Sequence, residues 1–315
     1  MLARNVLIFH AGALGDFVLT WPLALALGRL YAQSRIVYVT AAGKGQLAER
    51  VLRIESVDIE SGWHVLHGES PQLPPRPQQL LAGAHTVIHF AASVDERWTA
   101  NVRAIAQRAD IIWLHPNPPE RSGVHATRHV LAQLAEHRLI GPALEQMLRS
   151  IDDRGIGLAR TPGDEIVIHP GAGSPAKCWP AERFAALIAR LRDDGHAVKV
   201  LIGEVERERW PAGQIEPLAA VATSVVTPQT LLDLFLHLSE AKLVIANDSG
   251  PAHLAAIAGV PTFALFGASD PQRWRPIGPN VHVLRHDLLE DLSEQRVHEA
   301  VLSTLHSCKP PPPAR

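Results

Sequence analysis

Three short segments of the sequence hold residue types that could perform chemistry, and each follows a run of Val, Ile and Leu. In the first, HAGALGD at residues 10–16, Gly12 and Gly15 would let a ligand approach the backbone, and Asp16 would lie at the start of a helix. A carboxylate there can take a proton from an attacking hydroxyl, which makes Asp16 a candidate general base. It can equally serve only to stabilise the helix N-terminus, where negative charge is favoured.

The second segment, GAGSPAK at residues 171–177, also joins a predicted strand to a predicted helix. Gly171 and Gly173 fit the G-x-G-x-x-A pattern of a dinucleotide-binding turn, and Glu204 follows the next strand, where an oxidoreductase would hold a ribose. Lys177 is better explained as a mobile positive charge that contacts a phosphate, although a lysine in a solvated loop would look the same.

The third segment, NDSGPAH at residues 247–253, is the most specific of the three. It predicts a helix that begins near Pro251, so that the N–H groups of Ser249 and Gly250 form a cradle for an anion. Asp248 would then be held by backbone donors and orient the turn, or bond a sugar hydroxyl. His253 is either a donor to a diphosphate or an ordinary histidine on a helix face.

The elements that must position these segments follow an alternating β and α pattern, which indicates the α/β class with doubly wound parallel sheets. Five strands are predicted in each half, at residues 5–9, 35–40, 57–59, 86–90 and 111–114, and at 165–169, 197–202, 221–225, 243–246 and 262–266. Helices are predicted at 15–31, 181–194, 230–239, 251–258 and 291–306. The polar segment 150–164 predicts a linker, which divides the chain into domains at 1–155 and 156–290, followed by a C-terminal helix and frayed tail at 291–315.

Composition narrows the class of function. The chain has 315 residues and a net charge of −2, and neither half carries the positive excess of a nucleic-acid-binding protein. No apolar run reaches the ~18 residues that a membrane span needs, so we expect a cytoplasmic protein for which peripheral membrane contact stays open. Two cysteines exclude a cysteine-based zinc site, and His125 with His129 reads as an exposed pair on a helix without a third ligand, so no metal is expected.

In combination, GALGDFVLTWP, HPGAGSPAKCWP and NDSGPAHLAAIAGVPTFALFGASDP resemble the motifs of glycosyltransferase family 9, the ADP-heptose:lipopolysaccharide heptosyltransferases. The resemblance implies the GT-B fold, two Rossmann-like domains that face a cleft, the first on the acceptor side and the second binding the nucleotide sugar. It also implies inverting, metal-independent transfer of a heptose or similar sugar from an ADP-sugar to a lipopolysaccharide inner-core acceptor, at or near the inner leaflet of the inner membrane and without a cofactor.

The resemblance also assigns roles to individual residues. Asp16 corresponds to the catalytic base and Lys177 to the lysine that contacts the diphosphate. Donor contacts fall on the two later segments, with the ribose going to one of two glutamates: Gly171, Gly173, Ser174, Glu204, Glu206, Asp248, Ser249, Gly250 and His253.

His10 departs from the family pattern. With Gly12 and Gly15 it would lie on the acceptor side, where many relatives carry Arg or Lys before the glycines, and a histidine is not a permanent positive charge. Further candidate acceptor contacts are surface cations of the first half: Lys44, Arg97, Arg103, Arg121 and Arg128. Two other functions remain open, an NAD-dependent oxidoreductase built on the second segment and a non-catalytic protein that binds a sugar nucleotide.

Overall fold

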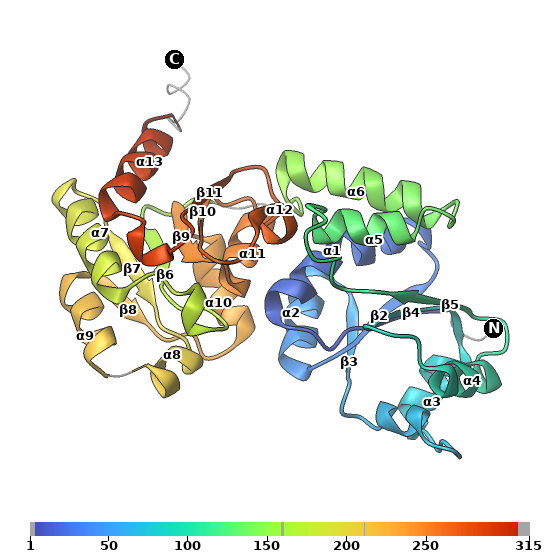
Figure 1. Ribbon diagram of the computed structural model, residues 1–315. Helices are drawn as coiled ribbons and strands as arrows, with labels where there is room; N and C mark the ends of the chain where they lie inside the picture. Colours follow the sequence, from blue (N-terminus) through green and yellow to red (C-terminus); the bar gives the residue numbers. More distant parts are fainter. Residues whose placement is uncertain (1–3, 159–160, 211, 308–315) are drawn as a thin grey trace. The chain divides into compact units, whose positions relative to one another are not determined.

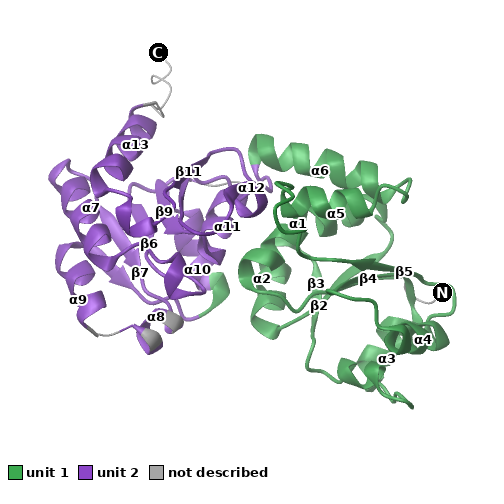
Figure 2. Cartoon of the chain, in the orientation of Figure 1, with its two compact units in different colours: residues 1–154, 230–232 green, residues 155–229, 233–315 purple. Residues whose placement is uncertain are grey.

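The computed structural model describes residues 4–158, 161–210 and 212–307, which form two compact units. Unit 1 comprises Met1–Arg154 with Thr230–Leu232, and unit 2 comprises Gly155–Gln229 with Asp233–Arg315 (Figure 2). Each unit is an α/β structure with its own parallel sheet (Figure 1). The predicted α/β class with doubly wound sheets is therefore confirmed.

The sheet of unit 1 has five parallel strands in the order β3-β2-β1-β4-β5. They are β1 (Asn5–Phe9), β2 (Arg35–Thr40), β3 (Glu55–Asp58), β4 (Ala84–Phe90) and β5 (Asp110–Leu114). The helices are α1 (Leu14–Leu30), α2 (Ala42–Leu52), α3 (Pro75–Ala82), α4 (Glu96–Ile105), α5 (Ala126–Gln133) and α6 (Ile140–Arg154), with a 3₁₀ turn η1 (Trp63–His67). The order reverses between β1 and β4, and ligands of open α/β sheets bind at the carboxyl ends of strands at such a point.

Burial on both faces explains why the strands of unit 1 read as continuous apolar runs. All five residues of β1 are buried. Leu7 and Phe9 point to one face, where they pack in one cluster with Trp63 of η1 and Trp98 of α4. On the other side of the unit, α1 packs along α6, so helices cover both faces as in a doubly wound fold.

The sheet of unit 2 has six parallel strands in the order β11-β10-β9-β6-β7-β8, with the reversal between β6 and β9. They are β6 (Ile166–His169), β7 (Val198–Leu201), β8 (Ser224–Val226), β9 (Leu243–Asn247), β10 (Thr262–Phe266) and β11 (Val281–Arg285). The helices are α7 (Ala181–Asp193), α8 (Glu204–Arg209), α9 (Ala212–Val221), α10 (Leu231–Ser239), α11 (Gly250–Ile257), α12 (Pro271–Trp274) and α13 (Glu294–Ser307), with 3₁₀ turns η2 (Pro175–Lys177) and η3 (Leu289–Asp291).

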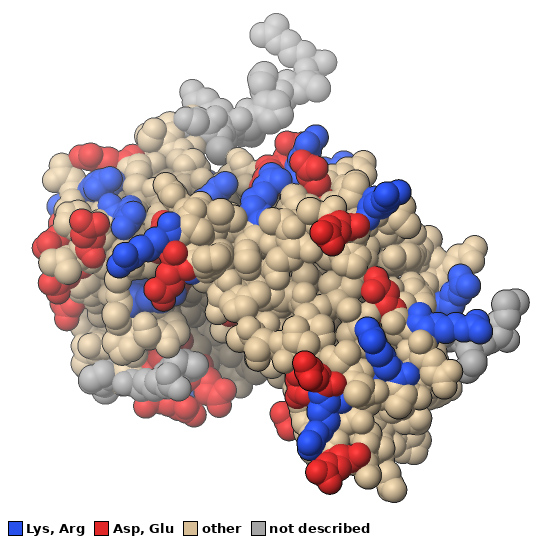
Figure 3. Space-filling view, turned by 45° about the vertical axis from the view of Figure 1, so that its right-hand side comes forward, with Lys and Arg blue, Asp and Glu red and all other residues tan. Residues whose placement is uncertain are grey.

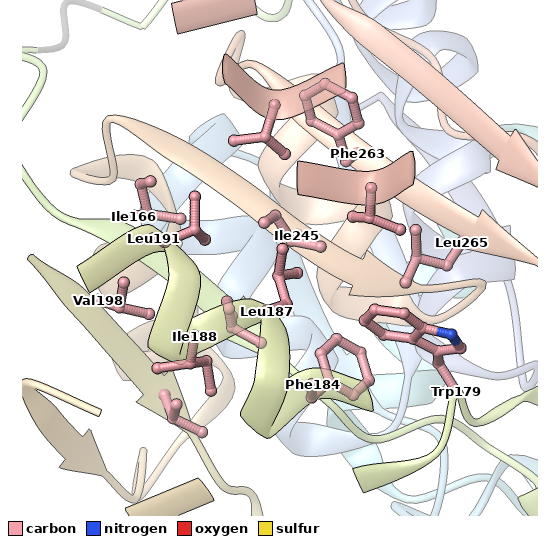
Figure 4. Close-up of a cluster of buried hydrophobic side chains, with 14 of the residues drawn as sticks. Ile166, Trp179, Phe184, Leu187, Ile188, Leu191, Val198, Ile245, Phe263 and Leu265 are labelled. Carbon is pink, nitrogen blue, oxygen red and sulfur yellow. The ribbon is translucent and has the colours of Figure 1, made fainter. Parts of the chain in front are cut away.

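One hydrophobic cluster holds α7 and α13 against the sheet of unit 2 (Figure 4). Phe184, Leu187 and Leu191 of α7 lie on the strand residues of this cluster, and Val297 and Val301 bring α13 to the same core. The Trp179 indole stands edge-on to Phe184 at 4.8 Å between ring centroids and donates its Nε1–H to the carbonyl of Leu292 at 2.9 Å. The C-terminal helix, whose packing partner the sequence did not indicate, is thus fastened to the strand-to-helix connection at residues 170–180.

The structure corrects several details of the sequence prediction. Helix α6 continues to Arg154, so the first residues of the predicted linker are helical, and strand β11 had not been predicted at all. His125 lies before α5 and caps it, since its Nδ1 accepts the Thr127 N–H at 3.3 Å, so His125 and His129 do not share an exposed helix face. Both histidines are half-buried. The predicted tail at 308–315 lies outside the described residues.

Acidic and basic side chains are mixed over the face seen in Figure 3. Within the described part of the chain, no helix combines the length and apolar character needed to cross a membrane.

Candidate functional site

The turn between β1 and α1 brings three of the predicted residues of unit 1 together. A Cβ atom on Gly12 would lie 3.0 Å from Cε1 of His10 and 3.3 Å from Cβ of Asp16, so the glycine sits in contact with both side chains. Asp16 is the third residue of α1, after Gly15, and the N-cap Ala13 offers no side-chain acceptor to the helix. The turn therefore presents a carboxylate in the first helical turn at the carboxyl end of a central strand.

His10 is buried and uncharged. Its ring packs against Phe17 at 5.6 Å and Phe90 at 5.7 Å between centroids, and only 2% of the residue is exposed. Burial lowers the pKa of His10 to about 3, and repulsion from Lys44 adds to the effect. His10 therefore brings an aromatic surface to this turn and no positive charge at neutral pH.

Lys44 supplies the positive charge that His10 lacks. It lies in the first turn of α2, and its Nζ donates to the carbonyl oxygen of Gly12. Burial lowers its pKa, and attraction by Asp16 acts in the opposite direction. The other cations proposed for the acceptor side, Arg97, Arg103, Arg121 and Arg128, are all exposed.

In unit 2 the second and third segments meet at the point where the strand order reverses, and an asparagine joins them. The side chain of Asn247, the last residue of β9, accepts the Trp179 N–H at 3.0 Å and donates to the carbonyl of Pro170 at 2.6 Å. Asn247 is fully buried, so both bonds are shielded from water. This clamp was not predicted, although a polar residue ending a buried strand next to Asp248 was a signal that could have suggested it.

Lys177 and Asp248 form an ion pair in this region. Lys177 Nζ lies 2.6 Å from Asp248 Oδ2, and the Ser269 hydroxyl donates to the same oxygen at 2.7 Å. The carboxylate of Asp248 is thus held by two side chains, whereas backbone donors had been expected to hold it. The aspartate side chain is 6% exposed and the lysine side chain 39%, so the ammonium remains accessible to an anion while its partner does not.

The start of α11 has the form expected of an anion-binding helix end. Ser249 is the N-cap residue, but its side chain does not cap the helix, because the hydroxyl donates to the carbonyl of Asn247 at 3.0 Å. Pro251 has no N–H, and those of Ala252 and His253 donate to the Ser249 carbonyl at 3.1 and 3.4 Å, so the N–H of Gly250 is the donor of this turn that could meet a ligand. His253 lies in the same turn and is 5% exposed.

The two glycines of the second segment have different surroundings. A Cβ atom on Gly171 would lie 1.8 Å from Oε1 of Glu206, so this glycine is required by the packing beneath it. Within the described part of the chain, no atom lies within 4 Å of a Cβ placed on the exposed Gly173. A cavity of about 370 Å³ adjoins this turn and is lined by Gly173, Ser174, Cys178, Trp210 and their neighbours.

The two glutamates that the sequence offers as candidates for a ribose contact differ in their exposure to solvent. Glu206 is 4% exposed and accepts the Gly203 N–H at 2.9 Å, whereas Glu204 is exposed at the first residue of α8. His169 Nε2 lies 3.9 Å from Glu206 Oε2, and burial lowers the pKa of His169 despite the opposing attraction by Glu206. His169 therefore meets the Glu206 side chain as a neutral imidazole at the end of β6.

Comparison with known proteins identifies relatives of this arrangement. The family model described as "Glycosyltransferase family 9 (heptosyltransferase)" matches residues 87–302. Lipopolysaccharide heptosyltransferase 3 of Escherichia coli is 33% identical over 143 residues, which cover 44% of this chain and 39% of that protein. The matched part thus spans about two fifths of that relative's length.

Two solved structures have the same fold. The Escherichia coli heptosyltransferase WaaC with ADP superimposes with a TM-score of 0.67 at 19% identity, covering 95% of this chain and 99% of the other. A family 9 glycosyltransferase from Veillonella parvula gives 0.70 at 20% identity, covering 96% and 97%. These likenesses bear out the GT-B fold class expected from the sequence.

Proposed function

The chain belongs to glycosyltransferase family 9, the heptosyltransferase family, and from that membership we propose that it moves a heptose from ADP-heptose to a sugar of the lipopolysaccharide inner core. The observation that carries the proposal is the anion-binding arrangement of unit 2. There the accessible ammonium of Lys177 forms an ion pair with the buried Asp248. This pair adjoins the N-terminus of α11, which has no side-chain cap. This arrangement suits the diphosphate of a nucleotide sugar.

In the proposed donor complex, Lys177 and the N–H groups at Ser249 and Gly250 contact the diphosphate, and His253 donates from the same helical turn. Asp248 orients the ammonium of Lys177 and does not face the phosphate, since its carboxylate already accepts from two side chains. Gly173 lets the diphosphate approach the backbone, because no atom of the described residues occupies the space where a side chain would stand.

The ribose hydroxyls go to one of two glutamates. Glu204 is exposed, whereas Glu206 is engaged by the Gly203 N–H and supports Gly171 from below. Replacing each with glutamine separates them. Loss of ADP affinity without loss of stability identifies the ribose contact, and loss of stability alone identifies the support.

Transfer proceeds as a single displacement with inversion at the anomeric carbon. Asp16 takes the proton of the acceptor hydroxyl as that oxygen bonds to the anomeric carbon, and the bond from this carbon to the phosphate oxygen breaks as ADP leaves. The extra negative charge on ADP is met by Lys177 and the dipole of α11. In this proposal, neither the proton transfer to Asp16 nor the stabilisation of the leaving ADP requires a metal or cofactor. Among the described residues, no group of three or more His, Cys, Asp or Glu side chains is arranged as a metal site.

The acceptor that we propose from the family also suggests where the protein would work. A lipopolysaccharide precursor is exposed on the inner leaflet of the inner membrane, so we place the protein in the cytoplasm in peripheral contact with that membrane. Unit 1, which carries Asp16, is the acceptor side, and unit 2 is the donor side.

The test is a transfer assay with ADP-heptose and a lipopolysaccharide that lacks heptose, read by the added mass of one heptose. An unchanged rate in excess chelator and inverted configuration in the product support the metal-independent single displacement. Stabilisation by NAD and not by any ADP-sugar would favour an oxidoreductase. Binding of ADP-heptose without transfer or hydrolysis would favour a non-catalytic binding protein.

A further inference from the structure

Lys44 is unusual in the sequence of unit 1. Residues 1–154 contain fourteen arginines and this one lysine, and the chain has only five lysines in all. Lysine differs from arginine in carrying a compact charge whose pKa responds to burial. A single lysine in an arginine-rich stretch is therefore a position at which that difference can matter.

The structure places the ammonium of Lys44 against the turn that bears Asp16. Nζ donates to the carbonyl oxygen of Gly12, which ties the first turn of α2 to the loop between β1 and α1. The same nitrogen lies 5.8 Å from the centroid of the Phe17 ring, one residue after Asp16. Lys44 thus lies against Gly12 in the turn and against Phe17 in the first residues of α1, and its side chain is half-buried there.

Two titratable groups near Lys44, Asp16 and His10, set the electrostatics of this turn. Attraction to Asp16 partly offsets the effect of burial on the pKa of Lys44. His10, on the other side of Gly12, is neutral with a pKa of about 3, and its Nδ1 has no hydrogen-bond partner among the described residues. His10 therefore supplies no positive charge at neutral pH, whereas the charge of Lys44 is attracted by Asp16.

We propose that Lys44 is a positioning residue for Asp16, holding the turn through the Gly12 carbonyl and supplying the positive charge beside the carboxylate. The assignment of Asp16 as base comes from the proposed function, and the inference about Lys44 rests on it. A positive charge near Asp16 stabilises the ionised carboxylate, which is the form that accepts a proton from the acceptor hydroxyl. Lys44 itself need not touch either substrate.

The first experiment needs no substrate. Protein labelled with ¹³C at the ε-carbon of lysine should give one signal for each of the five lysines, and each signal can be titrated. Asp16→Asn should lower the pKa of Lys44 by on the order of one pH unit, because an opposite charge nearby is lost. Lys199, which pairs with Glu165 in unit 2, is the internal control and should not respond. An unchanged pKa of Lys44 would overturn the inference, whether or not the protein transfers heptose.

The second experiment measures transfer. Lys44→Met should lower kcat by about tenfold or more, with the KM for the ADP-sugar and the stabilisation by ADP unchanged, because Lys177 and α11 belong to the other unit. Lys44→Arg, which keeps the charge but replaces the compact ammonium with a planar guanidinium, should recover only part of the loss. Arg50→Met is the matched control, since Arg50 is an exposed cation of the same helix and should leave kcat unaltered.

Combining Lys44→Met with Asp16→Asn separates positioning from a merely structural role. If Lys44 acts through Asp16, its removal should have almost no further effect once the carboxylate is gone. A full additional loss in the double variant would show that Lys44 acts independently, and the inference would fail while the heptosyltransferase assignment stood.

Discussion

Replacing the two glycines of the second segment one at a time should separate packing from ligand binding. In Gly171→Ala the new methyl group would lie 1.8 Å from Oε1 and 2.3 Å from Cδ of Glu206. That carboxylate is 4% exposed and accepts the Gly203 N–H, so it has little freedom to move. In Gly173→Ala the methyl group has no atom of residues 4–158, 161–210 or 212–307 within 4 Å.

The magnitude follows from how the strain at Gly171 can be relieved. Overpacking a fixed core costs about 1–3 kcal/mol, and moving Glu206 away would give up a buried hydrogen bond to a charged group, about 1.5–3 kcal/mol. The two routes together predict a loss of about 1–3 kcal/mol, which lowers the Tm of a unit of this size by roughly 2–12 °C. Gly173→Ala should change stability by less than about 1 kcal/mol and can raise it, because alanine restricts the unfolded chain.

Urea unfolding followed by tryptophan fluorescence measures the stability, with Trp179 as the reporter buried in unit 2. ADP affinity, measured by titration calorimetry, should instead be reduced more in Gly173→Ala than in Gly171→Ala. Gly173→Ala should weaken ADP binding by about tenfold or more, since its methyl group fills the space that a diphosphate would enter. If Gly173→Ala binds ADP as well as the wild type, or Gly171→Ala is as stable as the wild type, the reasoning about this turn is wrong.

Three further results are expected. Asp16→Asn should lower kcat by about 10²-fold or more while ADP still stabilises the protein as in the wild type, because a general base acts on the acceptor; normal turnover would remove Asp16 as the base. Lys177→Ala should lower kcat by about 10²-fold and raise the Kd for ADP, whereas unaltered values of both would remove it from the donor site. Because the pKa of His10 falls to about 3 on folding, unfolding takes up a proton below pH 6.5, and stability should fall from pH 6.5 toward pH 3 by up to about 1.4 kcal/mol per unit. His10→Asn should flatten this part of the stability curve, and an equally steep curve in that variant would contradict the burial of a neutral histidine.

Strands buried on both faces were the easiest elements to predict. β1, β2 and β10 were predicted with the bounds that the structure has, because each is an apolar run that ends at a turn. β11 was missed because it lies at the edge of its sheet and its residues are mostly half-buried, so VHVLR shows no continuous apolar run. Helix α6 was not predicted, and its last residues were assigned to the linker because SIDDR is polar, although Ile151 is buried in unit 1.

The sequence predicted which segments form the site, but it did not predict which side chains contact each other there. All three segments lie at the carboxyl ends of strands, as their order in the sequence implied. The Lys177–Asp248 pair was not predicted, since the partners are 71 positions apart and meet only because β6 and β9 are neighbours. The contacts of Ser269 with Asp248 and of Lys44 with Gly12 were not predicted either. The sequence does not distinguish a serine or lysine that makes such a contact from one exposed on a surface loop.

The sequence by itself determined the class of fold, the family and the three segments that carry polar groups, because hydrophobic periodicity and turn residues are local signals. Only the tertiary structure decided how these groups are paired and charged. The neutral state of His10, the support of Gly171 by Glu206 and the contact of Lys44 with the turn before Asp16 all depend on burial and on strand order. Both are properties of the packed chain, since desolvation and close approach arise only when distant segments come together.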